Sequence, residues 1–144
     1  KMWFGESDLD TPANIKSAAE KAIREGMTFY AHRRGIQDLR QAIATYVTAL
    51  YNIPLDLNRI TVAASGMNAI MVALQTAIGD GGNVVIVSPI WPNIINAVSA
   101  LGADHKLVSL KQKGLTWHLE LDELFSAVDS STAAIFIASP SNPT

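Results

Sequence analysis

Apolar positions divide the chain into a helical first part and an α/β second part. After Thr11 and Pro12, apolar side chains recur every three or four residues as far as Ile23, which predicts a helix that Thr11 caps and Gly26 ends. A second helix is expected over residues 35–51. Beyond it the periodicity changes, because short β-type runs alternate with helical patterns to the end of the chain. The apolar face of the second helix is expected to consist of Ile36, Leu39, Ile43, Val47 and Leu50.

The second part is expected to form a mostly parallel sheet with flanking helices, which makes the fold class α/β. Strands and helices alternate along it, and right-handed crossovers then leave the strands parallel. The β-branched run at residues 84–87 is typical of a strand buried on both faces, and helix 67–78 is apolar nearly all round, which predicts burial on more than one side. The expected domains are residues 1–58, a helical N-terminal arm, and residues 59–144, the first part of an α/β large domain. The other expected strands are residues 60–64, 105–110 and 133–138, and the other helices are residues 92–101 and 121–128.

Charge and composition narrow the possible partners. Lys and Arg number 11 against 13 Asp and Glu, and the net charge of −2 argues against nucleic acid and anionic membranes. No apolar run approaches the roughly 20 residues that span a bilayer, and a cytoplasmic location fits. The absence of cysteine excludes a disulfide framework. The three histidines lack metal-ligand spacing, so no metal site is expected.

The chain is apolar for its length. Hydrophobic residues make up 49% and charged residues 17% of its 144 residues. Two explanations stay open: an Ala-rich α/β core, or a surface that further chain or a second subunit covers.

Polar and aromatic residues follow the expected strands, at the edge where parallel sheets bind ligands. Ser65 and Gly66 precede a helix, whose free N–H groups and dipole favour an anion, although Ser65 can equally be an ordinary N-cap. Trp91 follows the second strand and can stack on a planar ring, or it can be a core residue beneath a loop. Asn142 follows the last strand and offers two donors and one acceptor, or simple turn chemistry.

Taken together and in this order, these segments resemble the pyridoxal-phosphate-dependent aminotransferases of class I and II. The resemblance rests on residues 3–12, 64–69, 88–93 and 139–144 and covers nearly the whole chain. It implies pyridoxal 5'-phosphate as cofactor, amino acid and 2-oxo acid substrates, and a homodimer. The implied reaction transfers an amino group between an amino acid and a 2-oxo acid, as part of a longer chain.

The resemblance also implies residue roles. The cofactor phosphate is held at Ser65, Gly66, Met67 and Asn68, where Met67 replaces a hydroxyl residue common in the family. The implied role of Trp91 is to stack on the cofactor ring. The remaining implied contacts are Asn142 with the ring hydroxyl and near the substrate carboxylate, the Gly5 backbone against that carboxylate, and Tyr30 with the phosphate of the neighbouring subunit.

Residues 31–34 depart from the neutral stretch that the family commonly has after the tyrosine. Here the chain carries Arg33 and Arg34, which could alter substrate recognition. The alternative is a solvated charge pair, and it is the interpretation that we favour on sequence alone.

No catalytic residue is assigned within the 144 residues. The family's cofactor-binding lysine, the Asp that pairs with the pyridine nitrogen and the Arg that grips the substrate carboxylate all lie beyond Thr144. Three alternatives stay open: a pyridoxal-phosphate-dependent β-lyase, an aminotransferase-like sensor domain of a transcriptional regulator, and a non-catalytic fragment or homologue. The regulator would need a helix-turn-helix domain upstream of Lys1.

Overall fold

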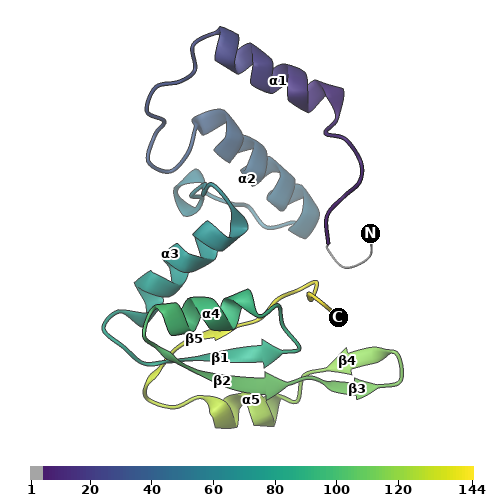
Figure 1. The fold of residues 1–144 in the computed structure, drawn as a ribbon, viewed down its shortest axis with the longest axis vertical. Helices are drawn as coiled ribbons and strands as arrows, with labels where there is room; N and C mark the ends of the chain where they lie inside the picture. Colours follow the sequence, from purple (N-terminus) through teal and green to yellow (C-terminus); the bar gives the residue numbers. More distant parts are fainter. Residues whose placement is uncertain (1–4) are drawn as a thin grey trace. The chain divides into compact units, whose positions relative to one another are not determined.

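A computed structural model describes residues 5–144 of the chain, drawn in Figure 1. Its contacts divide the chain into two compact units, Lys1–Val62 and Ala63–Thr144. Trp3 and Phe4, which belong to the first motif of the family resemblance, lie outside the described residues.

The first unit is helical and has little core of its own. None of the residues of the first helix, α1 (Ala13–Arg24), is buried, although its apolar stripe follows the predicted positions. The predicted Thr11 cap is wrong: Pro12 is the N-cap residue, and its carbonyl accepts the N–H groups of Ile15 and Lys16. Gly26 lies just past the helix with a φ of 71°, in the C-terminal role predicted for it. The elements of this unit are α1 (Ala13–Arg24), α2 (Gln37–Tyr51) and the short 3₁₀ helix η1 (Leu57–Arg59).

The buried face of α2 differs from the predicted one. The buried residues of this helix are Arg40 and Ala44, whereas Leu39 and Leu50 from the predicted apolar face are exposed. Arg40 can be buried because its guanidinium donates a hydrogen bond to the carbonyl oxygen of Leu57 in η1. A charged donor that satisfies a carbonyl tolerates burial that an unpaired charge would not.

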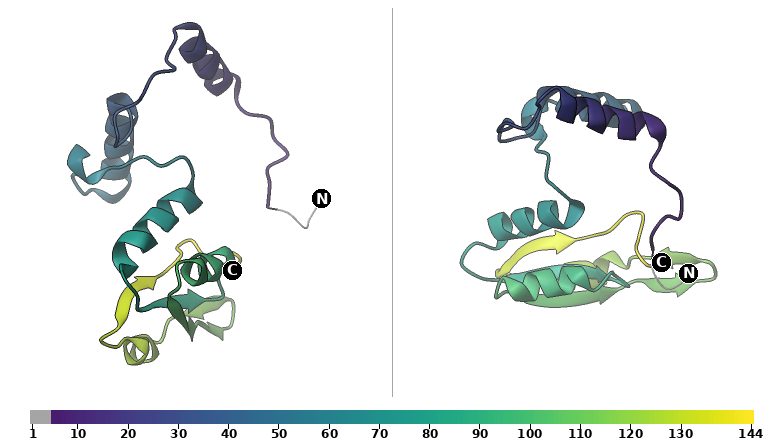
Figure 2. Two further views of the ribbon diagram at one scale, coloured as in Figure 1. Left: turned by 60° about the vertical axis from the view of Figure 1, so that its left-hand side comes forward. Right: turned by 45° about the horizontal axis from the view of Figure 1, so that its top comes forward.

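The second unit is a parallel sheet with helices on both faces, as predicted. Its strands lie in the order β2 (Asp104–Ser109), β1 (Asn83–Ser88) and β5 (Thr132–Phe136). Both pairings are parallel, with Val84 of β1 opposite His105 of β2 and Ala134 of β5. Figure 2 shows the helices of this unit beside its sheet from two further directions. The strands are β1 (Asn83–Ser88), β2 (Asp104–Ser109) and β5 (Thr132–Phe136), and the helices are α3 (Gly66–Ile78), α4 (Asn93–Ala100) and α5 (Leu121–Ala127).

The core of this unit is built around β1. Val84, Val85 and Ile86 of this central strand are fully buried, which confirms the strand predicted from their β-branched run. One face packs on α3 and α4, and the other packs on α5. Because burying one such side chain contributes roughly 1.5–3 kcal/mol, this strand is the main anchor of the unit. The helix residues buried in these two clusters are Leu74, Ile78, Ile94, Ala97, Val98 and Leu124.

Three features of the second part differ from the sequence predictions. Residues 60–64 form no strand, because no described strand pairs with them and the Val62 N–H donates to the Arg34 carbonyl instead. Helix α3 is buried on one side only, through Leu74 and Ile78, because no other element of its own unit covers its other face. A small antiparallel hairpin was not predicted, since its strands are too short and polar to show a periodicity. Its strands are β3 (Lys111–Lys113) and β4 (Thr116–His118).

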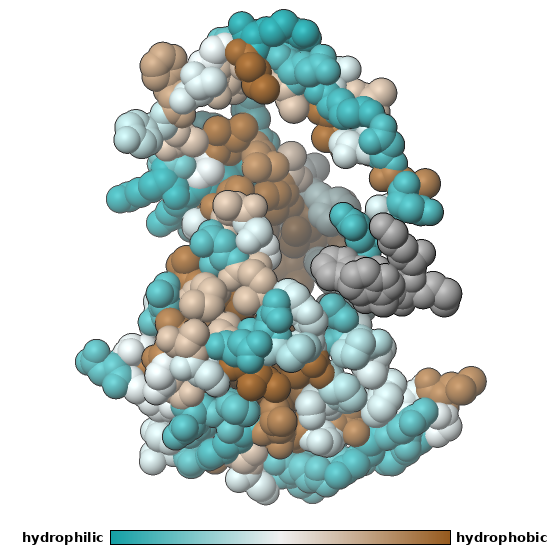
Figure 3. All heavy atoms as spheres, in the orientation of Figure 1, coloured by the Kyte–Doolittle hydropathy of each residue, from teal (hydrophilic) through white to brown (hydrophobic). Residues whose placement is uncertain are grey.

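Apolar side chains reach the surface of both units, as Figure 3 shows for one side of the molecule. They include Tyr46 and Leu50 in the first unit and Val72 and Leu115 in the second. Within residues 5–144, no helix has the length and apolar character needed to cross a membrane.

Candidate functional site

The loops that carry Trp91 and Asn142 leave the sheet at one edge. They follow β1 and β5, which are hydrogen-bonded parallel neighbours with Ile86 opposite Phe136. Parallel neighbours end at the same edge, which is where α/β sheets bind ligands. The structure therefore brings together two segments that lie about 50 positions apart in the sequence, as the parallel-sheet prediction requires.

The N-terminus of α3 lies toward the same edge. A short turn joins the C-terminus of α3 to the start of β1, and the helix lies antiparallel to the strand. The N-terminus of α3 therefore lies toward the carboxyl end of β1. Met67, in the first turn of α3, packs against the same core cluster as Ile90 from the loop after β1. The turn at residues 65–68 thus joins the other two segments on this side of the sheet.

Ser65 caps α3. Its Oγ accepts the backbone N–H of Asn68 at 3.1 Å, and its carbonyl accepts the N–H of Ala69 at 3.0 Å. The capping alternative is therefore confirmed. It leaves the anion-binding prediction open, because a hydroxyl that accepts one hydrogen bond still has its own proton to donate.

The turn also has unused backbone donors and open space. Within residues 5–144 the N–H groups of Gly66 and Met67 have no hydrogen-bond acceptor, as expected for the start of a helix. Apart from its chain neighbours and the backbone of its own helix, no described atom lies within 4 Å of a Cβ atom placed at Gly66, so an anion can approach this backbone closely. The Met67 side chain packs against the core cluster, so this residue can offer a ligand its backbone N–H.

Trp91 is not a core residue. The residue is 39% exposed, so the alternative of a tryptophan wedged beneath a loop is wrong. Its carbonyl accepts the N–H of Ile94 at 3.3 Å at the start of α4, which ties the residue to that helix. An indole held by its backbone and still accessible can present apolar area to a planar ligand.

Asn142 is exposed in the loop after β5. No residue among 5–144 forms a hydrogen bond with its side-chain amide, whereas Thr144 donates to Ser141 at 2.9 Å beside it. The described residues therefore leave both amide donors and the amide oxygen of Asn142 unused.

Tyr30 and Gly5 belong to the first unit. Tyr30 is fully exposed, and Phe29 beside it is 92% exposed. Among the described residues other than its chain neighbour, none has an atom within 4 Å of a Cβ atom placed at Gly5.

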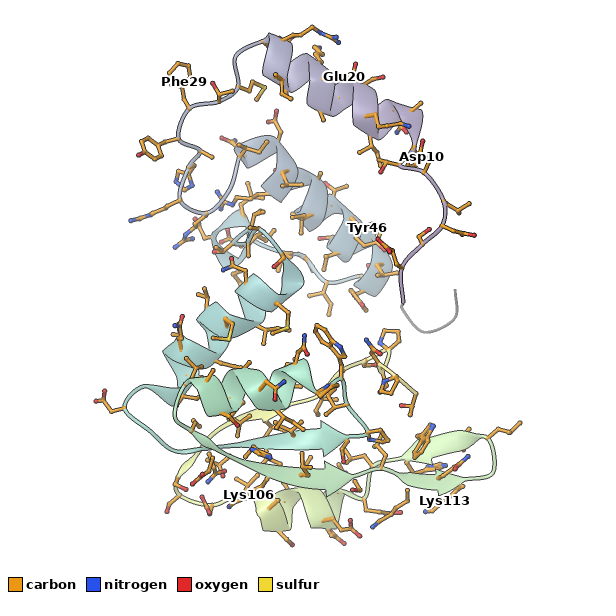
Figure 4. All side chains as sticks on the ribbon, viewed as in Figure 1. Asp10, Glu20, Phe29, Tyr46, Lys106 and Lys113 are labelled. Atoms are coloured by element: carbon orange, nitrogen blue, oxygen red, sulfur yellow. The ribbon has the colours of Figure 1, made fainter. Side chains whose placement is uncertain are left out.

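A polar network occupies the opposite edge of the sheet. Asn83, at the start of β1 and 4% exposed, donates to Asp129 at 3.1 Å and to Ser131 at 2.6 Å. Lys106 of β2, labelled in Figure 4, forms an ion pair with Asp129. Hydrogen bonds from Lys106 first, and then from Ser131 and Asn83, hold the pKa of the Asp129 carboxyl well below its usual range. This network joins the amino ends of the strands and has a structural role.

A second charged contact joins the hairpin to α5. Lys113 is also labelled in Figure 4. Its Nζ lies 2.8 Å from Oε1 of Glu120, the residue that precedes α5. The hydrogen bond and the charge of Lys113 lower the pKa of the Glu120 carboxyl. No group of three potential metal-ligating side chains occurs in the part of the chain that the structure describes.

Comparison with known proteins agrees with this arrangement. The family model described as "Aminotransferase class I and II" matches residues 1–144. The probable aspartate aminotransferase of Methanocaldococcus jannaschii is 31% identical over 99% of this chain, and the probable aspartate/prephenate aminotransferase of Aquifex aeolicus is 35% identical over 97% of it. Among solved structures, the N-succinyldiaminopimelate aminotransferase of Mycobacterium tuberculosis superposes with a TM-score of 0.91 at 30% identity, over 98% of this chain.

These matches cover only part of each known protein. The chain spans 37% of the Methanocaldococcus protein, 35% of the Aquifex protein and 37% of the Mycobacterium structure. The similarity therefore extends over the whole of this chain and over about a third of each relative.

Proposed function

Because the chain belongs to the class I and II aminotransferases, we propose that it is part of a pyridoxal-phosphate-dependent enzyme that transfers an amino group between an amino acid and a 2-oxo acid. The chain would supply the N-terminal arm, residues 1–58, and the first part of the cofactor-binding domain, residues 59–144, of a longer polypeptide. The observation that carries the proposal is the gathering of the α3 N-terminus and the loops after β1 and β5 at one sheet edge.

The residues at this edge fit the cofactor. The open backbone of Gly66, the free N–H groups of Gly66 and Met67 and the hydroxyl proton of Ser65 suit a phosphate group. The backbone N–H of Asn68 already donates to the Ser65 hydroxyl, so Asn68 would contribute its side-chain amide. When bound, pyridoxal phosphate would supply an electron sink for chemistry at the substrate α-carbon, while the protein supplies orientation and electrostatics.

The remaining contacts are proposed from the family resemblance. The accessible Trp91 would stack on the cofactor ring, and the free amide of Asn142 would bond the ring hydroxyl and lie near the substrate carboxylate. The open backbone of Gly5 would lie against that carboxylate. Tyr30, exposed in its own unit, would reach the phosphate in the neighbouring subunit of a homodimer.

The names of the relatives suggest the first substrate to test. Two of them are described as aspartate or aspartate/prephenate aminotransferases, so we take aspartate as the first amino donor. The relatives named here are aminotransferases and support neither the β-lyase nor the transcriptional-regulator alternative.

The test uses the full-length protein with pyridoxal phosphate. We expect aspartate to convert the cofactor to its amino form in a single turnover, with loss of the aldehyde absorption band, and a 2-oxo acid to restore it. A β-lyase would instead release ammonia from a β-substituted amino acid without needing a 2-oxo acid. No spectral change with any of the common amino acids would contradict the proposal.

The proposed assembly and location can be tested separately. Light scattering after size exclusion should give twice the subunit mass if Tyr30 completes the site of a neighbouring subunit. Cell fractionation should place the protein in the cytoplasm.

A further inference from the structure

Arg34 contacts residues 58–62, the segment that precedes the proposed phosphate turn at residues 65–68. Its guanidinium donates to the carbonyl of Asn58 at 2.6 Å, across 24 positions of sequence. Its own carbonyl accepts the N–H of Val62 at 3.0 Å. The side chain and the backbone of one residue therefore hold the two ends of residues 58–62.

Gly35, the residue after Arg34, packs closely against Val62 at the end of the same segment. Gly35 has a φ of 96°, and a Cβ atom there would lie 2.6 Å from Cγ2 of Val62. Only glycine combines that backbone conformation with so close an approach. Arg40, buried on α2, donates to the carbonyl of Leu57 and extends the contact by one residue.

These contacts matter because residues 60–64 have no strand partner in the described chain. Without a β-ladder, residues 57–62 are held by the Arg40 and Arg34 side chains at the carbonyls of Leu57 and Asn58, by the Arg34 carbonyl at the Val62 N–H, and by the burial of Ile60. Val62 lies three positions before Ser65, so the segment leads directly into the proposed phosphate turn. Arg33, the neighbouring arginine, is exposed, and no described residue forms a hydrogen bond or ion pair with its side chain.

We propose that Arg34 is a positioning residue that fixes the segment leading into the phosphate turn and thereby strengthens cofactor binding. Only the claim about cofactor binding rests on the proposed function. The proposal differs from both sequence-based interpretations of Arg34, a solvated charge and a contact with substrate, because this partly exposed residue donates from its guanidinium to a backbone carbonyl. A charged donor to a carbonyl is worth more than a neutral one, so its loss should be measurable.

The experiment compares Arg34→Ala, Arg34→Lys and the matched control Arg33→Ala in the full-length protein. Hydrogen exchange of peptides that contain Val62 reports the segment in the cofactor-free protein. Titration with pyridoxal phosphate, followed by absorbance, gives the cofactor Kd. Steady-state kinetics give KM for the amino acid.

We expect Arg34→Ala to speed exchange at Val62 about tenfold and to raise the cofactor Kd roughly three- to tenfold. Arg34→Lys, which keeps a cationic donor, should recover most of both losses, and Arg33→Ala should change neither. Unchanged exchange in Arg34→Ala overturns the proposal. Faster exchange with an unchanged Kd overturns the positioning role, as does a raised substrate KM with normal exchange, which would assign Arg34 to the substrate.

The two proposals fail in different ways. If the wild-type protein binds no pyridoxal phosphate, the proposed function is wrong and the cofactor half of this proposal falls with it. The exchange comparison between Arg34→Ala and Arg33→Ala still decides whether Arg34 fixes residues 58–62.

Discussion

Ser65 and Asn68 are joined by a hydrogen bond in which the Ser65 hydroxyl oxygen accepts the Asn68 backbone N–H at 3.1 Å. This bond satisfies one of the free donors at the start of α3, so the backbone donors left for an anion are those of Gly66 and Met67. The hydroxyl proton of Ser65 remains available. One side chain can therefore cap the helix and bind a phosphate at the same time.

Substitutions of Ser65 should separate these two tasks. Ser65→Ala removes both the cap and the donor, so we expect the cofactor-free protein to lose about 1 kcal/mol of stability and the cofactor to bind more weakly. Ser65→Asp keeps a capping oxygen but places a negative charge against the phosphate. Urea unfolding should show near-normal stability for Ser65→Asp, and titration should show weak cofactor binding. Cofactor affinity equal to wild type in Ser65→Asp would contradict a phosphate site here.

Trp91 and Trp117 provide a matched pair for the stacking prediction. The two residues are 39% and 41% exposed, but Trp91 follows β1 and Trp117 lies in the β3–β4 hairpin. We expect Trp91→Ala to raise the cofactor Kd by roughly tenfold and to shift the visible absorption of the bound cofactor, because an aromatic contact on a planar ring is lost. Trp117→Ala should leave both unchanged. Equal effects of the two substitutions would remove Trp91 from the site.

Gly35 and Gly26 separate close packing from backbone conformation. Both have a positive φ, of 96° and 71°, but only a Cβ atom at Gly35 would collide with a neighbour, Val62. Gly26→Ala should cost roughly 1 kcal/mol for the strained backbone. Gly35→Ala should cost a further 1–3 kcal/mol or so for the overpacked contact. The difference is measured by urea unfolding, and equal losses would show that Val62 moves aside freely.

The Asp129 network should govern stability in acid. Because its hydrogen bonds lower the pKa of the carboxyl in the folded protein, the unfolded chain binds the proton more readily. The stabilisation is therefore complete above the unfolded pKa of about 4 and is lost as the pH falls below it. Asp129→Asn should be less stable at pH 7 and should lose less stability than wild type on going from pH 5 to pH 3. Asp8→Asn, at an exposed position, is the control, and an identical acid response in Asp129→Asn and wild type would contradict the assignment.

The sequence predicted those elements whose residues carry their own local signal. The strand β1 and the Ser65 cap can each be predicted from neighbouring residues in the sequence, without knowledge of distant contacts. Both are present in the structure. Regular alternation of β1, α4, β2, α5 and β5 was sufficient to predict a parallel sheet. The segments after β1 and β5 then meet at one edge as a consequence of topology.

The features that the sequence did not reveal depend on partners far away in the chain. Residues 60–64 have a strand-like pattern, but a strand needs a neighbour, and periodicity cannot show whether one exists. Arg40 looks like a surface residue until its carbonyl partner, Leu57, is known. The same holds for Asn83, which is buried because Asp129 and Ser131 satisfy its amide 46 and 48 positions later.

Borohydride reduction of the full-length protein with bound pyridoxal phosphate, followed by peptide mass mapping, tests the central claim most directly. We predict a single pyridoxyl-lysine, on a peptide outside residues 1–144, because the resemblance places the cofactor-binding lysine beyond Thr144. The lysines within the chain, such as Lys16 and Lys106, should remain unmodified at equimolar cofactor. No modified lysine, or modification spread evenly over surface lysines, would contradict the claim that this chain is part of a pyridoxal-phosphate enzyme.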